Sequence, residues 1–223
     1  MSLIAKDLIS DVVISLEPGD SGEKALSMMN IFQVRHLPVV KNRELLTIIN
    51  EDDILKNGFE KKIEEYNLRE RKIYVTENTH IFNIIDSLAK NDLSLIPVLD
   101  AEQKYLGCIT QQDLFQYFGD IFTFEFPGSI IELLVPPRDY SLQEISHIVE
   151  SEKASIIGLM INIEKPDDEY MTVILKLNKR NISAIVSSFE RFGYKIKSSY
   201  SNENYSLDVL KERYDALMHY LNV

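Results

Sequence analysis

The sequence predicts a mixed fold, α/β in its first half and α+β in its second, and three observations support this. The dipeptide Pro38-Val39 recurs as Pro97-Val98, 59 residues later, and the residues before each copy share a strand-then-helix pattern. The region 127–201 alternates β-like runs and amphipathic stretches in the order βαββαβ. A final amphipathic stretch, 202–223, predicts one more helix. Together these patterns predict two domains built on different plans.

Composition places the chain among ordinary globular proteins. It has 223 residues, 45% of them apolar and 26% charged, and a formal net charge of −11. Nucleic-acid affinity depends on Lys and Arg that neutralise phosphates, so this acidic chain is not expected to bind DNA or RNA. No apolar run approaches the roughly 18 residues of a membrane span, and the acidic first residues do not resemble a secretory signal. We therefore expect a cytoplasmic protein with no membrane partner, which the single cysteine, Cys108, also fits.

The first half is an internal repeat. The segment 14–40 aligns with 73–99 at a constant offset of 59. Each copy begins with a short β-like run, passes through a polar turn and enters a helix whose apolar positions follow the i, i+3, i+4, i+7 pattern. These inward positions are Gly22, Ala25, Leu26 and Met29 in the first copy and Ile81, Ile84, Ile85 and Leu88 in the second. A repeat of this size cannot bury its own faces, so the copies are expected to pack as a pseudo-twofold pair.

Each copy closes with an acid-ended helix start. After Pro-Val the chain turns, forms a second apolar run and reaches Asn50-Glu51-Asp52-Asp53 in one copy and Thr110-Gln111-Gln112-Asp113 in the other. The final aspartate follows the proline by 15 residues in the first copy and by 16 in the second. A hydroxyl followed three residues later by an acid is typical of a capping box. On that interpretation Thr110 and Asp113 only stabilise the helix.

These motifs resemble a tandem pair of CBS domains, also called a Bateman module, over roughly residues 3–120. The family's signature is a Pro-Val strand followed by Gly-apolar-x-Thr/Ser-x-x-Asp. The second copy matches it in full, with Gly107, Thr110 and Asp113. In the first copy Thr47 and Asn50 replace the glycine and the hydroxyl, and only Asp53 is retained. We predict the two repeats at 1–66 and 67–126.

The resemblance implies binding of adenine nucleotides in clefts between the copies, with the aspartate on the ribose hydroxyls and the hydroxyl near phosphate. A carboxylate has two acceptor oxygens for two cis-hydroxyls, and a helix N-terminus offers N–H donors to an anion. The predicted site comprises Gly107, Thr110, Asp113, Pro97 and Val98. A weaker second cleft comprises Asn50, Asp53, Arg35, His36, Pro38 and Val39. Three successive acids at 51–53 already satisfy the positive end of that helix, which disfavours phosphate there.

The βαββαβ order at 127–201 predicts a ferredoxin-like domain, with four antiparallel strands and two helices on one face. After a CBS pair, this arrangement resembles an ACT domain, as in CBS-ACT proteins of the acetoin-utilisation type. The loop Pro-Pro-Arg-Asp-Tyr-Ser lacks the glycine of amino-acid-binding ACT domains, so we expect the sheet to serve a homodimer instead. The last helix, 202–223, has Leu207, Leu210, Tyr214, Leu217 and Leu221 on one face. It is expected to dock on its own chain or a partner's.

Neither a catalytic nor a metal site is expected. The four histidines, His36, His80, His147 and His219, lie far apart, and the sequence has no nucleophile elbow, Walker loop or dinucleotide fingerprint. Cys108 lies in a β-like run and is expected to be a buried apolar residue. We predict a non-catalytic regulatory protein that needs no cofactor and couples an adenosine ligand, such as AMP, ADP or ATP, to its subunit arrangement. Two alternatives stay open, a ligand-free dimerisation scaffold and an amino-acid sensor acting through the ACT-like domain.

Overall fold

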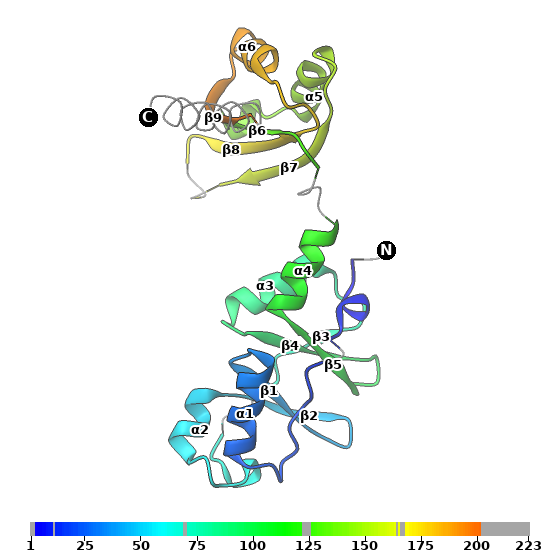
Figure 1. Cartoon of the computed structure of the whole chain (residues 1–223), viewed down its shortest axis with the longest axis vertical. Coiled ribbons are helices and arrows are strands. Elements are labelled where there is room, and N and C mark those ends of the chain that lie inside the picture. Colours follow the sequence, from blue (N-terminus) through cyan, green and yellow to red (C-terminus); the bar gives the residue numbers. More distant parts are fainter. Residues whose placement is uncertain are drawn as a thin grey trace, which may run out of the picture. The chain divides into compact units, whose positions relative to one another are not determined.

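The structure divides the chain into two units. The computed structural model describes residues 3–10, 12–68, 71–121, 126–163, 165 and 168–201. The N-terminal unit is Met1–Asp120 and the C-terminal unit is Ile121–Val223 (Figure 1). The predicted last helix, 202–223, lies outside the described residues. Among those that are described, no helix is long and apolar enough to cross a membrane.

The N-terminal unit contains two copies of one arrangement, which confirms the predicted repeat. The first copy consists of α1 (Gly22–Phe32), β1 (His36–Lys41), β2 (Glu44–Asn50) and α2 (Glu51–Asn57). The second consists of β3 (Val75–Thr76), α3 (Ile81–Lys90), β4 (Leu95–Leu99), β5 (Tyr105–Thr110) and α4 (Gln111–Ile121). The β-like run that begins the first copy in the sequence, 12–16, forms only a bridge between Leu16 and Val39, and Val12 and Ile14 ahead of it are exposed.

The pairing registers of the two copies agree. Strand β1 pairs antiparallel with β2, as β4 does with β5, and each ladder shifts register at the same point, after Val39 and after Val98. The parallel bridge from Leu16 to Val39 corresponds to the parallel pairing of Val75 with Val98. A slip of one residue would turn every side chain to the other face. Equal registers therefore place the two acid-ended helix starts at equivalent positions.

Two short segments complete the hydrophobic cores of the two copies. One lies at the start of the chain, and the other lies between the copies. They contain the 3₁₀ helices η1 (Ala5–Leu8) and η2 (Ile63–Glu65). In the second copy, Ala5 N–H donates to Thr79 O at 2.8 Å; in the first, Ile63 N–H donates to Asp20 O at 2.9 Å. Thr79 and Asp20 are equivalent positions of the repeat, so the two segments do the same work. The start of the chain thus completes the second copy, and the linker completes the first.

The cores of the two copies also interlock. Leu95 and Cys108, from the second copy, are fully buried in the core of the first, whereas Ile48 of the first copy is buried in the core of the second. Burial raises the pKa of the Cys108 thiol to about 12, so no thiolate forms at neutral pH. The predicted buried, apolar character of Cys108 is therefore confirmed. Each copy depends on the other for part of its hydrophobic interior.

The C-terminal unit has the predicted ferredoxin-like arrangement. Its elements are β6 (Ser129–Val135), η4 (Pro137–Asp139), α5 (Leu142–Ser151), β7 (Ile156–Asn162), β8 (Met171–Leu177), α6 (Ser183–Arg191) and β9 (Lys195–Tyr200). The strand order is β7-β8-β6-β9, and every pairing is antiparallel. Helices α5 and α6 cover one face of this sheet, and the core lies between them and the strands (Figure 1). Ser141 caps α5, since its Oγ accepts from Glu144 N–H at 3.2 Å.

Candidate functional site

The signature of the second copy folds into a closed cap at the start of α4, the Thr110 cap. Thr110 ends β5 with its side chain buried, and Asp113 lies in the first turn of α4. Asp113 N–H donates to Thr110 Oγ1 at 3.0 Å, while Asp113 Oδ2 accepts from Thr110 N–H at 2.9 Å and from the Thr110 hydroxyl at 2.6 Å. The bonds that the carboxylate accepts from described residues both end on Oδ2. Oδ1 is therefore left to accept from another group.

Gly107 lies beneath the beginning of the chain. It pairs with Val98 across β4 and β5, and Ser10 N–H donates to the carbonyl of its neighbour Cys108 at 2.8 Å. A methyl group at Gly107 would come within 2.5 Å of Ile9 Cγ2, so the missing Cβ makes room for Ile9. The sequence predicts that this glycine lets a ligand approach the backbone. In the structure, the side chain of Ile9 lies at that place.

A cavity lies beside Asp113. Its volume is about 190 Å³, and its lining comes from the beginning of the chain and from α4: Asp7, Leu8, Ile9, Asp113, Gln116 and Tyr117. The Tyr117 hydroxyl is buried without a hydrogen-bond partner among the described residues. Sequence reasoning missed Asp7, Ile9 and Tyr117. Tyr117 follows Asp113 by four residues and so shares its helix face, which is a signal that spacing alone provides.

The first copy builds a similar cap at the start of α2, the Asn50 cap. Asp53 N–H donates to Asn50 Oδ1 at 2.9 Å, and Asn50 N–H donates to Asp53 Oδ2 at 3.1 Å. A cation lies beside this cap, since Arg71 Nη1 is 3.3 Å from Asp53 Oδ2. The backbone N–H of Arg71 donates to Thr47 Oγ1 at 3.2 Å. Thr47, at the signature glycine position, thus binds the backbone of the segment that passes beside it. At the equivalent position of the second copy, Gly107 makes room for Ile9 instead.

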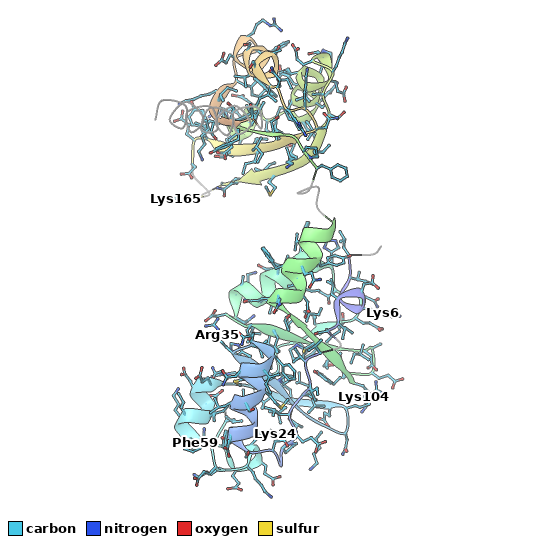
Figure 2. All side chains as sticks on the ribbon, viewed as in Figure 1. Lys6, Lys24, Arg35, Phe59, Lys104 and Lys165 are labelled. Carbon is cyan, nitrogen blue, oxygen red and sulfur yellow. The ribbon has the colours of Figure 1, made fainter. Side chains whose placement is uncertain are left out.

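Arg35 and His36 contact the second copy. Ser94 N–H donates to His36 Nδ1 at 3.2 Å, and Arg35 N–H donates to Ser94 Oγ at 2.9 Å. The Arg35 guanidinium lies 3.3 Å from Asp92 in an exposed ion pair of small energetic value, where the two copies meet (Figure 2). Burial, together with the charge of Arg35, lowers the pKa of His36 below its usual range. The imidazole ring therefore stays neutral, which leaves Nδ1 free to accept from Ser94 N–H. This hydrogen bond helps to hold the two copies together.

The Pro-Val dipeptides support the caps from behind. Pro38, Val39, Pro97 and Val98 are all buried, in β1 and β4. Each lies on the strand that pairs with the one leading into a cap, and none of them lines the cavity beside Asp113. Across the part of the chain that the structure describes, no three His, Cys, Asp or Glu side chains are grouped to hold a metal ion. The predicted residues are thus brought together as two caps and their supports.

Two interlocked copies, each ending in an aspartate-capped helix, define the N-terminal unit as a tandem module of the predicted class. The CBS domain family model matches residues 5–60 and 63–120. These matches cover more than half of the chain, which therefore belongs to the CBS domain family. The two matched ranges correspond to the two copies.

Three known proteins are similar to parts of this chain. Inosine-5'-monophosphate dehydrogenase of Thermoplasma acidophilum is 27% identical over 175 residues, which are 77% of this chain and 34% of that enzyme. A CBS domain pair/ACT domain protein from Thermotoga maritima is 16% identical, with a TM-score of 0.47 over 54% of this chain and 98% of that one. The CBS domain pair of protein MJ0100, solved with 5'-methylthioadenosine and S-adenosyl-L-methionine, is 26% identical, with a TM-score of 0.45 and the same two coverages. The chain spans about a third of the length of the dehydrogenase.

Proposed function

We propose that the N-terminal unit is a regulatory module that binds an adenosine-containing ligand at the Thr110 cap. The observation that carries the proposal is the Asp113 carboxylate, whose Oδ2 closes the cap while Oδ1 is left to accept beside a cavity. An ionised carboxylate accepts hydrogen bonds and donates none, so Oδ1 selects a group that donates, as ribose hydroxyls do. The chain belongs to the CBS domain family, and the resemblance to that family implies that adenine nucleotides bind between the copies. This membership supports the same class of ligand.

Thr110 orients Asp113 in this proposal. The hydroxyl proton of Thr110 is already donated to Asp113 Oδ2, so it is not available to a phosphate while the cap is closed. Direct polar contact with the ligand then comes from Asp113, and apolar contact with a purine ring comes from Leu8 and Ile9, which line the same cavity. Gly107 contributes by making room for Ile9.

Ligand entry requires the beginning of the chain to move. The cavity has a volume of about 190 Å³, whereas sites for small ligands are usually about 300–1,000 Å³. Residues 7–9 form one side of it, so this side must move outward to admit a nucleoside, and the same residues then line the widened site. A ligand that binds the opened arrangement better shifts the population toward it. Because this segment also completes the second copy, the shift gives the protein a means of regulation without catalysis.

Thermal unfolding with adenosine, AMP, ADP, ATP and S-adenosylmethionine tests the proposal. A ligand at a hundred times its dissociation constant stabilises a protein by about 2.7 kcal/mol, which raises the midpoint by roughly 5–10 °C. We expect such a shift with at least one of these compounds and its loss in Asp113→Ala. The matched control is Gln112→Ala, which changes an exposed neighbour in the same helical turn and is expected to keep the shift.

The shift must be measured against each variant's own ligand-free midpoint. Asp113→Ala also removes half of the capping box, so we expect it to lose about 1 kcal/mol of stability before any ligand is added. An unchanged shift in Asp113→Ala would remove that residue from the site. If no compound shifts the wild-type midpoint at millimolar concentration, the caps are structural only and the scaffold alternative is favoured.

We also infer that the C-terminal unit is an ACT-like dimerisation domain, because β7 is an edge strand without charge protection. The strand is last in the sheet order, and Ile156–Asn162 contains no charged residue. Met160 and Ile161 are 57% and 43% exposed. Proteins usually protect such edges with charges, prolines or bulges, and the register shift in β7 is confined to its first residues. A second copy of β7, antiparallel about a twofold axis, covers the edge and makes a homodimer.

Met160→Lys is expected to convert this dimer to a monomer. A twofold axis brings the two lysines of the paired strands near each other, and an edge lysine also disfavours strand addition. Sedimentation velocity over a range of protein concentrations measures the change. The matched control is Phe192→Lys, whose ring is 50% exposed at the end of α6 and away from β7. A wild-type chain that stays monomeric, or a dimer that survives Met160→Lys, contradicts the inference.

A further inference from the structure

The cavity beside Asp113 is acidic. Asp7 and Asp113 both line it, and none of the described residues in its lining is basic. Lys6, next to Asp7 in the sequence, lies on the outer side of η1 (Figure 2). A phosphate bound beside Asp113 would therefore face two acidic residues and no described basic one. Like charges repel each other even where water partly screens them.

The adjacent helix end has few donors left for an anion. Gln111 N–H donates to Ser94 O at 3.0 Å, and Asp113 N–H donates to Thr110 Oγ1 at 3.0 Å. Two of the first three N–H groups of α4 therefore already have acceptors. The carboxylate of Asp113 already lies at the positive end of the helix dipole. The start of α4 therefore does not offset the repulsion between a bound phosphate and the two carboxylates.

The Asn50 cap differs in that one cation, Arg71, accompanies the three acids in the first turn of its helix. Arg71 lies 3.3 Å from Asp53 Oδ2 and its side chain is 42% exposed. A guanidinium has five N–H donors, and this ion pair uses one of them, so an anion can share the group. The two caps have equivalent carboxylates but differ in a charged residue nearby. Asp7 lines the cavity beside the Thr110 cap, whereas Arg71 pairs with Asp53 at the Asn50 cap.

We propose that Asp7 makes the Thr110 cavity select adenosine derivatives that carry no phosphate and are neutral or positively charged at the 5' position. The inference rests on the proposed function and narrows its ligand class. Asp113 accepts from the ribose hydroxyls of any adenosine derivative and so does not distinguish among them. Asp7 distinguishes among them, because it repels a 5'-phosphate and attracts a cationic substituent. It is a specificity-determining residue of this cavity.

Calorimetric titration of the full chain with adenosine and with AMP tests this inference. We expect the wild-type chain to bind adenosine at least about ten times more tightly than AMP, since juxtaposed like charges are costly in a binding site. Asp7→Asn is expected to bind AMP more tightly and so to lower the ratio of the two affinities by about tenfold. The same titrations in an Arg71→Met background exclude AMP held at the Asn50 cap. Loss of adenosine binding in Asp113→Ala assigns the signal to this cavity.

Glu102→Gln is the matched control, because it removes the same charge from an exposed turn and is expected to leave the ratio unchanged. Asp7 is exposed and Asn has nearly its shape, so an unaltered melting curve is expected for Asp7→Asn. If adenosine binds but the ratio does not change in Asp7→Asn, charge selection is wrong and the proposed function stands. If neither compound binds to any variant, the proposed function fails, and charge selection fails with it.

Discussion

Replacing Phe189 with alanine is expected to destabilise the C-terminal unit by about 3–5 kcal/mol. Phe189 is fully buried on α6, within the core between the helices and the sheet. Its ring packs edge-on against Tyr194, with ring centroids 5.5 Å apart. The surrounding strands are held by their ladders and can close only part of the cavity that remains. Urea unfolding, combined with hydrogen exchange to separate the two units, measures the loss.

Phe192→Ala is the matched control for this substitution. Phe192 follows the last residue of α6, but its ring is 50% exposed, so we expect a change within about 0.5 kcal/mol. Hydrogen exchange of the N-terminal unit is expected to stay the same in both variants. Equal losses in the two variants would show that the core between α5, α6 and the sheet does not determine the stability of this unit.

Leu95→Ala is expected to cost the N-terminal unit about 2–5 kcal/mol and to weaken both copies at once. Leu95 begins β4 of the second copy, yet it is fully buried in the core of the first. It directly follows Ser94, whose bonds to Arg35 and His36 join the copies. We expect faster hydrogen exchange in α1 and β1 as well as in β4, within one cooperative unfolding transition.

Leu55→Ala provides the comparison for Leu95, because Leu55 lies on α2 with 63% of its surface exposed. It is expected to change the free energy of unfolding by no more than about 0.5 kcal/mol. Faster exchange in Leu95→Ala that is limited to the second copy would contradict the shared interior. Two separate unfolding transitions in the N-terminal unit would contradict it as well.

Local patterns were sufficient to predict most of the described helices and strands, but not the single bridge that forms at 12–16 in place of a strand. The helix stripe at Ile81, Ile84 and Leu88 is buried as its spacing requires, and the βαββαβ order is that of the observed sheet. Both signals are short-range, because they follow from helix and strand periods. The contribution of residues 3–8 to the second copy has no such signal. It depends on backbone bonds such as that of Ala5 with Thr79, which any side chain permits.

The residues of the candidate site likewise divide into those that the sequence predicts and those that only the structure reveals. The cap formed by Thr110 and Asp113 is predictable, because the two residues are three apart and the bonds between them are dictated by a helix start. Asp7 comes from the other end of the unit, more than a hundred residues away, and nothing in the sequence pairs it with Asp113. Arg71 lies outside the signature for the same reason, so its charge beside Asp53 becomes visible only in three dimensions.

The backbone bond of Ala5 with Thr79 means that the second half of the N-terminal unit is not a separable building block. A fragment that begins at residue 67 would lose the strip of chain that seals its interior, and would have to borrow that strip from another molecule. Covalent linkage turns such borrowing into an intramolecular event, with an effective concentration on the order of millimolar. The tether between the halves is therefore also the reason that the second half can fold at ordinary protein concentrations.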